Sequence, residues 1–201
     1  MQQEENLPQE ELGEVLPVVD SDNFQISLRK KFGLGNMQVE QRLDYAMEWI
    51  KSLGKLWGQG IMDENGIMSQ GHGFVFAPEH FSEPHRKMFD KHGFQLMICA
   101  KKYYADGKFN EKTGKLDKWV DTVDECIIRF ARELVAHPKF KIFCLIAGDS
   151  DYVPLLKDLK KHGIKVALVA PTADSLGGEL LNYVDVNPAN RKRMVLYLDE
   201  I

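Results

Sequence analysis

Short apolar segments alternate with amphipathic ones along most of the chain. Strands are predicted where mostly apolar runs stand between polar or glycine-containing turns, at Val15–Asp20, Phe74–Ala77, Phe94–Ala100, Ile142–Ala147, Lys165–Ala170 and Met194–Leu198. Helices are predicted where apolar residues recur at helical spacing, at Val39–Leu53, Ser82–Lys91, Lys118–His137, Ser150–His162 and Ser175–Leu181. This alternation indicates an α/β fold with a mainly parallel sheet that is covered on both faces.

Two internal segments and the N-terminus depart from this pattern. Residues 55–73 are rich in glycine, and Asn65-Gly66 predicts a two-residue hairpin turn. Residues 101–118 are mostly polar and predict an exposed loop or a hairpin. Residues 1–14 are rich in Gln and Glu and cannot bury enough apolar surface to become ordered. We therefore expect a disordered acidic tail followed by a single domain over residues 15–201.

Composition is that of a globular protein, with 44% hydrophobic and 28% charged residues. No apolar run approaches the ~20 residues of a membrane-spanning helix, and the acidic N-terminus does not resemble a secretory leader. We expect a soluble, cytoplasmic protein without membrane contact. Its cysteines, Cys99, Cys126 and Cys144, are odd in number and lie in apolar surroundings, which favours free thiols in a reducing compartment.

The formal net charge of −4 is unevenly distributed. Residues 1–14 contribute −5, so residues 15–201 carry +1 and lack the strong basic excess that is typical of nucleic-acid-binding domains. Lysines nevertheless crowd residues 101–118, where the adjacent Tyr103 and Tyr104 could stack on bases. We expect phosphate contacts from three of these lysines, Lys108, Lys112 and Lys115. A solvated charged surface and ordinary aromatic packing are the alternatives.

Two of the predicted strands end in acid-rich turns, Asp20-Ser21-Asp22-Asn23 and Asp149-Ser150-Asp151. Functional groups gather beyond the carboxyl ends of parallel strands, so these acids converge if the two strands are neighbours. Carboxylates packed together repel one another, and a divalent cation removes that conflict. Oxygen ligands without nearby Cys or His favour Mg²⁺ or Mn²⁺. The simpler alternative is that Asp and Ser only cap the helices that follow.

The predicted helix Lys118–His137 offers further acids near its start. Asp117, Asp121 and Asp124 are four and three residues apart, a spacing that places them on one side of a helix. Asp121 and Asp124 directly follow apolar seam residues and therefore flank the buried face. We expect Asp121 to be the inward-facing carboxylate, with Asp124 as the second choice. Stabilisation of the helix dipole is the alternative role for these acids.

These motifs resemble the NYN domain, a family that includes LabA-like proteins and belongs to the PIN-like nuclease superfamily. The resemblance is carried by three stretches and a following strand: Val18-Val19-Asp20-Ser21-Asp22-Asn23-Phe24, Lys118-Trp119-Val120-Asp121, and Ala147-Gly148-Asp149-Ser150-Asp151-Tyr152-Val153-Pro154-Leu155 before Gly163-Ile164-Lys165-Val166. It covers roughly Val15 to Asp185. It implies a Rossmann-like three-layer sandwich whose acidic cluster binds Mg²⁺ or Mn²⁺ and often cleaves RNA.

The resemblance also implies roles for individual residues. By position, Asp20 and Asn23 match the first motif, Asp121 the second, and Asp149 and Asp151 the third. The four aspartates of this set would be the catalytic and metal-binding residues. Asn23 and Ser150 would orient ligands or the scissile phosphate, and Lys118 would neutralise a phosphate oxygen or hold the neighbouring acids. Asp22 is an acid beyond the family pattern, and Asp124 is the alternative to Asp121.

The sequence therefore predicts metal-dependent hydrolysis of phosphodiester bonds, with single-stranded RNA as the favoured substrate. A catalytically silent fold that binds RNA or a protein partner is one alternative. A phosphatase of the haloacid dehalogenase type is another, but Asn23 follows Asp22 where Thr or Val is usual. Val153 also stands where its second acid is expected after Gly148-Asp149. The sequence leaves open whether the chain forms a homodimer.

Overall fold

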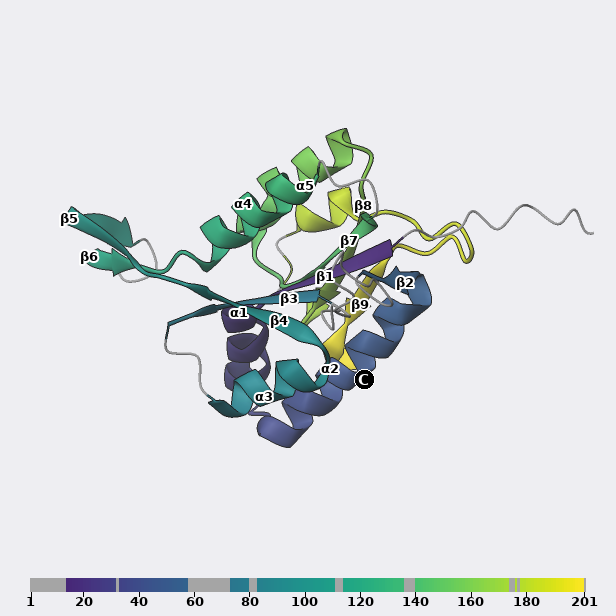
Figure 1. Ribbon diagram of the computed structural model, residues 1–201, viewed down its shortest axis with the longest axis horizontal. Coiled ribbons are helices and arrows are strands. Elements are labelled where there is room, and N and C mark those ends of the chain that lie inside the picture. Colours follow the sequence, from purple (N-terminus) through teal and green to yellow (C-terminus); the bar gives the residue numbers. More distant parts are fainter. Residues whose placement is uncertain are drawn as a thin grey trace, which may run out of the picture.

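The chain forms a parallel sheet between two layers of helices, from which a two-stranded hairpin projects (Figure 1). The computed structural model describes residues 14–31, 33–57, 73–79, 83–110, 114–135, 140–173, 176 and 178–200. No helix in this part of the chain is both long and apolar enough to cross a membrane. The sheet and its two helical layers confirm the expected three-layer α/β sandwich. Residues 1–13 of the expected acidic tail lie outside the described residues.

The large sheet consists of β1 (Glu14–Asp20), β2 (Lys55–Leu56), β3 (Gly73–Pro78), β4 (Phe94–Cys99), β7 (Phe140–Ile146), β8 (Lys165–Ala170) and β9 (Val195–Tyr197). The hairpin is formed by β5 (Lys102–Asn110) and β6 (Lys115–Val120). The helices are α1 (Ser21–Ile26) with the π-helical turn η1 (Ser27–Lys31), α2 (Asn36–Leu53), α3 (Glu83–Lys91), α4 (Val123–Leu134) and α5 (Val153–Lys161). Short 3₁₀ turns are η2 (Ser150–Tyr152), η4 (Leu180–Tyr183) and η5 (Leu198–Glu200).

Strand β1 lies in the middle of the sheet, whose order is β4-β3-β1-β7-β8-β9, with β2 beside the start of β1. The described pairings in this sheet are all parallel. The chain extends the sheet from β1 to β3 and β4, then returns to β7 on the other side of β1. The strand order thus reverses between β1 and β7, where Val19 lies beside Ile146. Open α/β sheets bind ligands beyond the carboxyl ends of the strands at such a reversal.

Continuous apolar runs explain why the central strands are buried on both faces. Helices α4 and α5 cover one face of the sheet, and α1, α2 and α3 cover the other (Figure 1). Val18 of β1, Phe143 of β7 and Leu168 of β8 are fully buried in the resulting core. The carboxyl ends of β1 and β7 are therefore held in place by the packed core.

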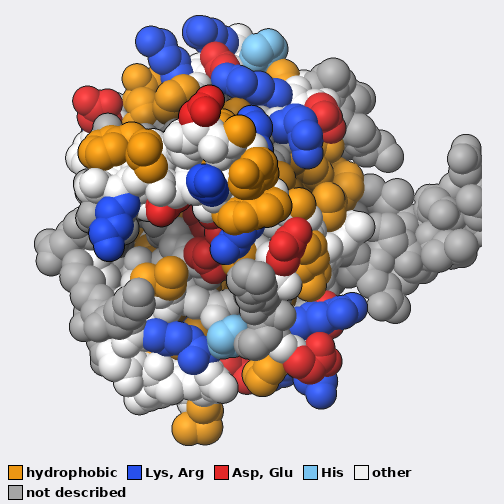
Figure 2. Space-filling view, turned by 90° about the vertical axis from the view of Figure 1, so that its left-hand side faces the viewer, with side chains coloured by type: hydrophobic (Ala, Val, Ile, Leu, Met, Phe, Trp, Pro, Cys, Tyr) orange, Lys and Arg blue, Asp and Glu red, His pale blue; other side chains and the backbone are white. Residues whose placement is uncertain are grey.

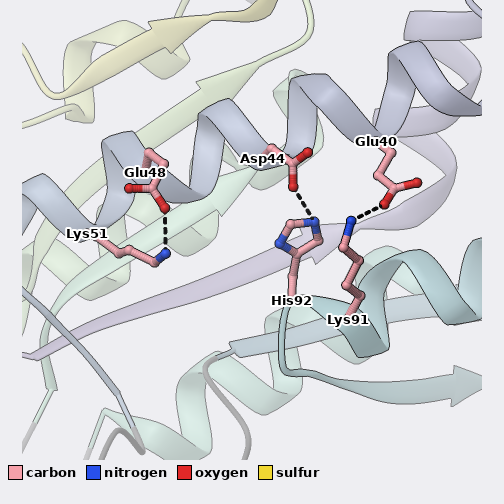
Figure 3. A network of polar contacts seen from close by, with 6 residues as sticks. All are labelled: Glu40, Asp44, Glu48, Lys51, Lys91 and His92. Atoms are coloured by element: carbon pink, nitrogen blue, oxygen red, sulfur yellow. Dashed lines mark hydrogen bonds and ion pairs between the residues drawn. The ribbon is translucent and has the colours of Figure 1, made fainter.

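A polar network joins α2 to the end of α3 (Figure 3). Lys91 Nζ lies 2.5 Å from Glu40 Oε1, and His92 Nε2 lies 3.0 Å from Asp44 Oδ1. Burial lowers the pKa of His92, while the charge of Asp44 raises it. Because water screens exposed ion pairs, we attribute the docking of these helices mainly to their apolar faces.

The largest difference from the sequence prediction is at the start of α4. The helix expected from Lys118 begins at Val123, because the preceding residues form β6 and pair with β5. Asp117 therefore lies in a strand and Asp121 in the connection, so the prediction that these acids and Asp124 share one helical side is wrong.

Smaller expectations have mixed outcomes. The polar segment 101–118 does contain a hairpin, and the three cysteines are free thiols. The helix expected from Ser150 begins as the 3₁₀ turn η2. The turn expected at Asn65-Gly66 lies outside the described residues, as does part of the helix expected at Ser175–Leu181.

Candidate active site

A pocket of about 260 Å³ opens beyond the carboxyl ends of β1 and β7. Its described lining residues are Asp20, Asp22, Asn23, Ile26, Ser27, Asp121, Val123, Asp124 and Asp149. Five of these are aspartates, and none of the described lining residues is Lys, Arg or His. Figure 2 looks onto this end of the molecule and shows acidic side chains in a hollow bordered by basic and apolar ones. The two acidic turns therefore lie side by side as expected, because Asp20 and Asp22 of the first turn and Asp149 of the second line the same pocket.

Asp20 is the most enclosed acid of the pocket, with only 4% of its surface exposed. It is the last residue of β1 and the N-cap of α1, so its Oδ1 accepts the N–H of Asn23 at 2.9 Å. Burial raises the pKa of Asp20 to about 7. Hydrogen bonds from Asn23 and Tyr152 oppose this rise, and the charges of Asp124 and Asp22 add to it.

Tyr152 is fully buried behind the lining residues of the pocket, where it joins Asp20 to Asp124. Its hydroxyl oxygen lies 2.8 Å from Asp20 Oδ2 and 2.7 Å from Asp124 Oδ1. Burial and the two neighbouring acids raise the pKa of the Tyr152 phenol, so it stays protonated. A phenol carries one proton and can donate to only one carboxylate at a time. The second short contact is a hydrogen bond only when that carboxyl group itself holds a proton.

Asp124 lies in the first turn of α4 and is half-buried. Burial raises its pKa, the hydrogen bond from Tyr152 lowers it, and the charges of Asp149, Asp151 and Asp121 raise it further. The raised pKa values of both Asp20 and Asp124 are consistent with a proton shared around the Tyr152 hydroxyl. Sequence reasoning gave no role to Tyr152, although the residue belongs to the third motif.

Asn23 ties the two acidic turns together. Its side-chain oxygen accepts the N–H of Gly148, which follows β7, at 2.9 Å. Asp149 in turn caps η2, because its Oδ1 accepts the N–H of Asp151 at 3.2 Å. The capping roles considered from the sequence are therefore present at both Asp20 and Asp149. A hydrogen bond from a backbone N–H does not neutralise a carboxylate, however, so capping does not by itself remove the repulsion between two such groups.

Asp121 lies at the exposed rim of the pocket, and Asp22 is a further half-buried acid of its lining. Asp121 is exposed in the connection before α4, and its Oδ1 accepts the N–H of Val123, the first residue of that helix, at 3.1 Å. Asp22 is half-buried in α1, and this burial raises its pKa. The charges of Asp121 and Asp124 raise that pKa further, whereas Lys101 lowers it.

Several predicted residues lie outside the pocket lining. Asp151 and Ser150 are exposed on η2, although the charge of Asp151 still raises the pKa of Asp124. Lys118 is exposed on β6. Lys108 and Lys115 lie on the hairpin, and Lys112 is outside the described residues.

The donor chemistry of the pocket suits a hard divalent cation, because carboxylate oxygens are the ligands that Mg²⁺ and Mn²⁺ prefer. As the side chains lie, however, the described residues contain no group of three or more His, Cys, Asp or Glu that could hold a metal ion. One oxygen on each of Asp20, Asp121 and Asp149 already accepts a backbone N–H. The chemistry of these residues thus suits a divalent cation. Coordination, however, requires their carboxylates to turn toward a common point.

The fold and pocket define a Rossmann-like α/β protein with an acidic cluster where the strand order reverses. The NYN domain family matches residues 76–187, and the chain belongs to this family of the PIN-like superfamily. The match spans Asp121, Asp124 and the third motif but begins after Asp20. It confirms the resemblance and leaves the haloacid dehalogenase alternative without support.

A solved structure shows the same fold. A protein of unknown function from Vibrio parahaemolyticus RIMD 2210633 superposes with a TM-score of 0.57 and 16% sequence identity. The alignment covers 89% of this chain and 93% of that one. At this identity the likeness shows the fold alone. No curated protein matches the chain in sequence.

Proposed function

We propose that the protein is a metal-dependent nuclease that hydrolyses phosphodiester bonds, with single-stranded RNA as its substrate. The observation that carries this proposal is the convergence of Asp20, Asp124 and Asp149 in one pocket at the strand-order reversal. Membership of the NYN family supports it, because this family belongs to the PIN-like nuclease superfamily.

In this proposal the acids in and beside the pocket contribute to one cation site. Asp20, Asp124 and Asp149 would hold Mg²⁺ or Mn²⁺, with Asp22 and the exposed Asp121 contributing from the same lining and Asp151 acting from outside it. A divalent cation bound there would activate a water and stabilise the negative charge that develops on the leaving oxygen.

The remaining predicted residues would orient the acids and the substrate. Asn23 keeps the two acidic turns at a fixed separation through its bond to Gly148. Ser150 is exposed beside Asp149 and would donate a hydrogen bond to a phosphate oxygen. Lys118 lies outside the pocket lining, so we assign it, with Lys108, Lys112 and Lys115, to the nucleic-acid backbone.

A catalytically silent NYN domain that binds RNA or a protein is the second candidate. The observation that favours it is that no three acidic groups among the described residues lie ready to coordinate a metal ion. Fold membership alone does not establish catalysis.

The proposal is tested with labelled single-stranded RNA, single-stranded DNA and duplexes of the same sequence, each with Mn²⁺, Mg²⁺ or chelator. The matched variant is Asp149→Asn, because Asn keeps the size and the capping ability of Asp while it removes the charge. We expect cleavage of single-stranded RNA that both chelator and the variant abolish. Cleavage at the parental rate in the variant would exclude Asp149 as a ligand or reveal a contaminant. RNA binding without cleavage would favour the silent domain.

A further inference from the structure

The hairpin of β5 and β6 presents large apolar side chains on both of its faces. Tyr103 pairs with Trp119, and Phe109 pairs with Leu116. Directly paired residues share a face, and successive residues along a strand alternate between faces. Trp119 and Leu116 are three apart on β6, so the two pairs lie on opposite faces. We call these the tryptophan face and the leucine face.

The tryptophan face has the composition of a surface that binds single strands. Tyr103 and Trp119 are 53% and 61% exposed, and their ring centroids are 5.0 Å apart. By the pairing register, Lys108 and Lys115 lie on the same face. Asp117, also on this face, accepts a hydrogen bond from Asn110 at 2.6 Å. Aromatic rings that stack on bases beside lysines that meet phosphates are the usual elements of such surfaces.

The base of the hairpin adjoins the rim of the acidic pocket. Asp121, which lines the pocket, follows Trp119 by two residues. Lys101, whose charge acts on Asp22, precedes Tyr103 by two residues. The Thr122 hydroxyl donates to the carbonyl of Ala100 at 2.6 Å and fastens the two ends of the hairpin together. At the rise of an extended strand, Trp119 therefore lies about 7 Å along the chain from Asp121 at the rim, a separation that one nucleotide can span.

The hairpin has a defined shape that would keep the rings in place. β5 carries extra residues between Tyr103 and Lys108, where its register against β6 shifts. Gly107 in this bulge has a positive φ of 76°, and a Cβ there would lie 3.0 Å from that of Leu116. Figure 1 shows that the hairpin projects away from the sheet, and large side chains on both of its faces are exposed.

We propose that Tyr103 and Trp119 form a stacking platform for unpaired bases of a nucleic-acid strand whose backbone enters the acidic pocket. That the bound strand is then cleaved rests on the proposed function. The binding itself does not require cleavage. Every base can stack on an aromatic ring, so the platform does not select a particular sequence. It selects unpaired nucleic acid over duplexes. It thereby gives the preference for single strands a structural cause.

The test compares variants on the two faces of the hairpin. Trp119→Ala and Tyr103→Ala alter the proposed platform. Phe109→Ala and Leu116→Ala are matched controls, because these residues are 60% and 64% exposed on the opposite face. Binding of a fluorescent single-stranded RNA is measured by anisotropy with chelator present, so that cleavage cannot interfere. Thermal melts check that each variant is folded, and Trp119→Phe tests whether another ring restores binding.

We expect each platform variant to weaken binding by about 5- to 150-fold, the range for loss of one stacked base. The leucine-face variants should change it less than about twofold. The salt dependence should stay parental in Trp119→Ala, because stacking releases no counterions. In the double variant Lys108→Gln/Lys115→Gln, the slope of the logarithm of the binding constant against the logarithm of the salt concentration should become shallower by roughly 0.7 per lost phosphate contact.

Some results would overturn the platform. These are unaltered binding by Trp119→Ala, equal losses on both faces, or no RNA binding by the parent. A changed oligomeric state in the tryptophan-face variants with unaltered RNA binding would identify the face as an interface between copies. RNA that is bound through the platform but never cleaved would contradict the nuclease proposal and leave the platform standing.

Discussion

The hydroxyl of Tyr152 lies 2.8 Å from Oδ2 of Asp20, although 132 residues separate the two in the chain. The same hydroxyl lies 2.7 Å from Oδ1 of Asp124. One side chain after β7 therefore contacts an acid at the end of β1 and another at the start of α4. We interpret Tyr152 as a positioning residue, because it sets the separation of two carboxylates without needing to touch a substrate.

Replacing Tyr152 with Phe keeps the ring and removes this link. Two enclosed carboxyl groups then lose a partner, which typically costs about 1–3 kcal/mol of unfolding free energy. We expect a decrease of that size at pH 7 in urea unfolding and a fall in metal-dependent cleavage. Tyr45→Phe on α2 is the control, because that ring is 47% exposed. Parental stability and rate in Tyr152→Phe would show that the link does not position the acids.

The burial of Asp20 predicts a pH dependence of stability. Its folded-state pKa is about 7, raised from 3.8. Between these values the folded protein holds a proton that the unfolded chain has released, so stability falls as the pH rises. The loss from one such group reaches about 1.4 kcal/mol per pH unit. This contribution is fully present below about pH 4 and is lost above about pH 7.

Asp20→Asn isolates this effect, since Asn is neutral and can still cap α1. With chelator present, the stability of Asp20→Asn relative to the parent should increase steadily from pH 4.5 to 7.5 in urea unfolding. Asp106→Asn, at an exposed position of β5, is the control and should run parallel to the parent. A parallel curve for Asp20→Asn as well would mean that Asp20 titrates normally.

The existence and mainly parallel course of the central strands could be predicted because these strands are buried on both faces. Val15–Val19 and Ile142–Ala147 are continuous apolar runs with acid-rich turns after them, and such a pattern has few other solutions. The acids that follow them were predicted to meet because parallel strands end at one edge. That reasoning needs only the positions of the strands, so it holds without any knowledge of side-chain contacts.

The start of α4 could not be predicted in the same way. Val120 and Val123 fit a helical seam, but Trp119 and Val120 also fit a strand, and pairing with β5 decides between the two. Local periodicity contains no information on that distant partner. For the same reason the sequence could place Tyr152 in a motif but could not show that its hydroxyl reaches Asp20.

The shifted helix start changes which acid of this segment we expect to bind a cation more strongly. Asp124 is half-buried and bonded to Tyr152, whereas Asp121 is exposed and accepts a backbone N–H. We therefore expect Asp124→Asn to reduce the Mn²⁺-induced rise in melting temperature more than Asp121→Asn does. Asp121→Asn is the matched variant because Asn can accept the same N–H. Equal reductions, or a larger one in Asp121→Asn, would restore Asp121 as the main ligand of this segment.

Stability measurements on Asp149 variants separate a metal site from acids that only cap helical turns. If the pocket acids repel one another, Asp149→Asn should raise the melting temperature measured with chelator, because it removes one charge and keeps the cap. Asp149→Ala should lose the cap as well, which costs about 0.5–2 kcal/mol. If the acids only cap, Asp149→Asn should leave the chelated protein unchanged.

Adding the cation distinguishes the two interpretations a second time. Mn²⁺ or Mg²⁺ at 100 times its dissociation constant should stabilise the parent by about 2.7 kcal/mol, provided that the unfolded chain does not bind it. The same concentration should stabilise Asp149→Asn less, because one ligand has lost its charge. The parent would then gain more from the cation although it is the less stable protein without it, as expected where function is kept at the expense of stability. Melts of both proteins that do not respond to the cation would instead assign these acids to capping and favour the silent NYN domain.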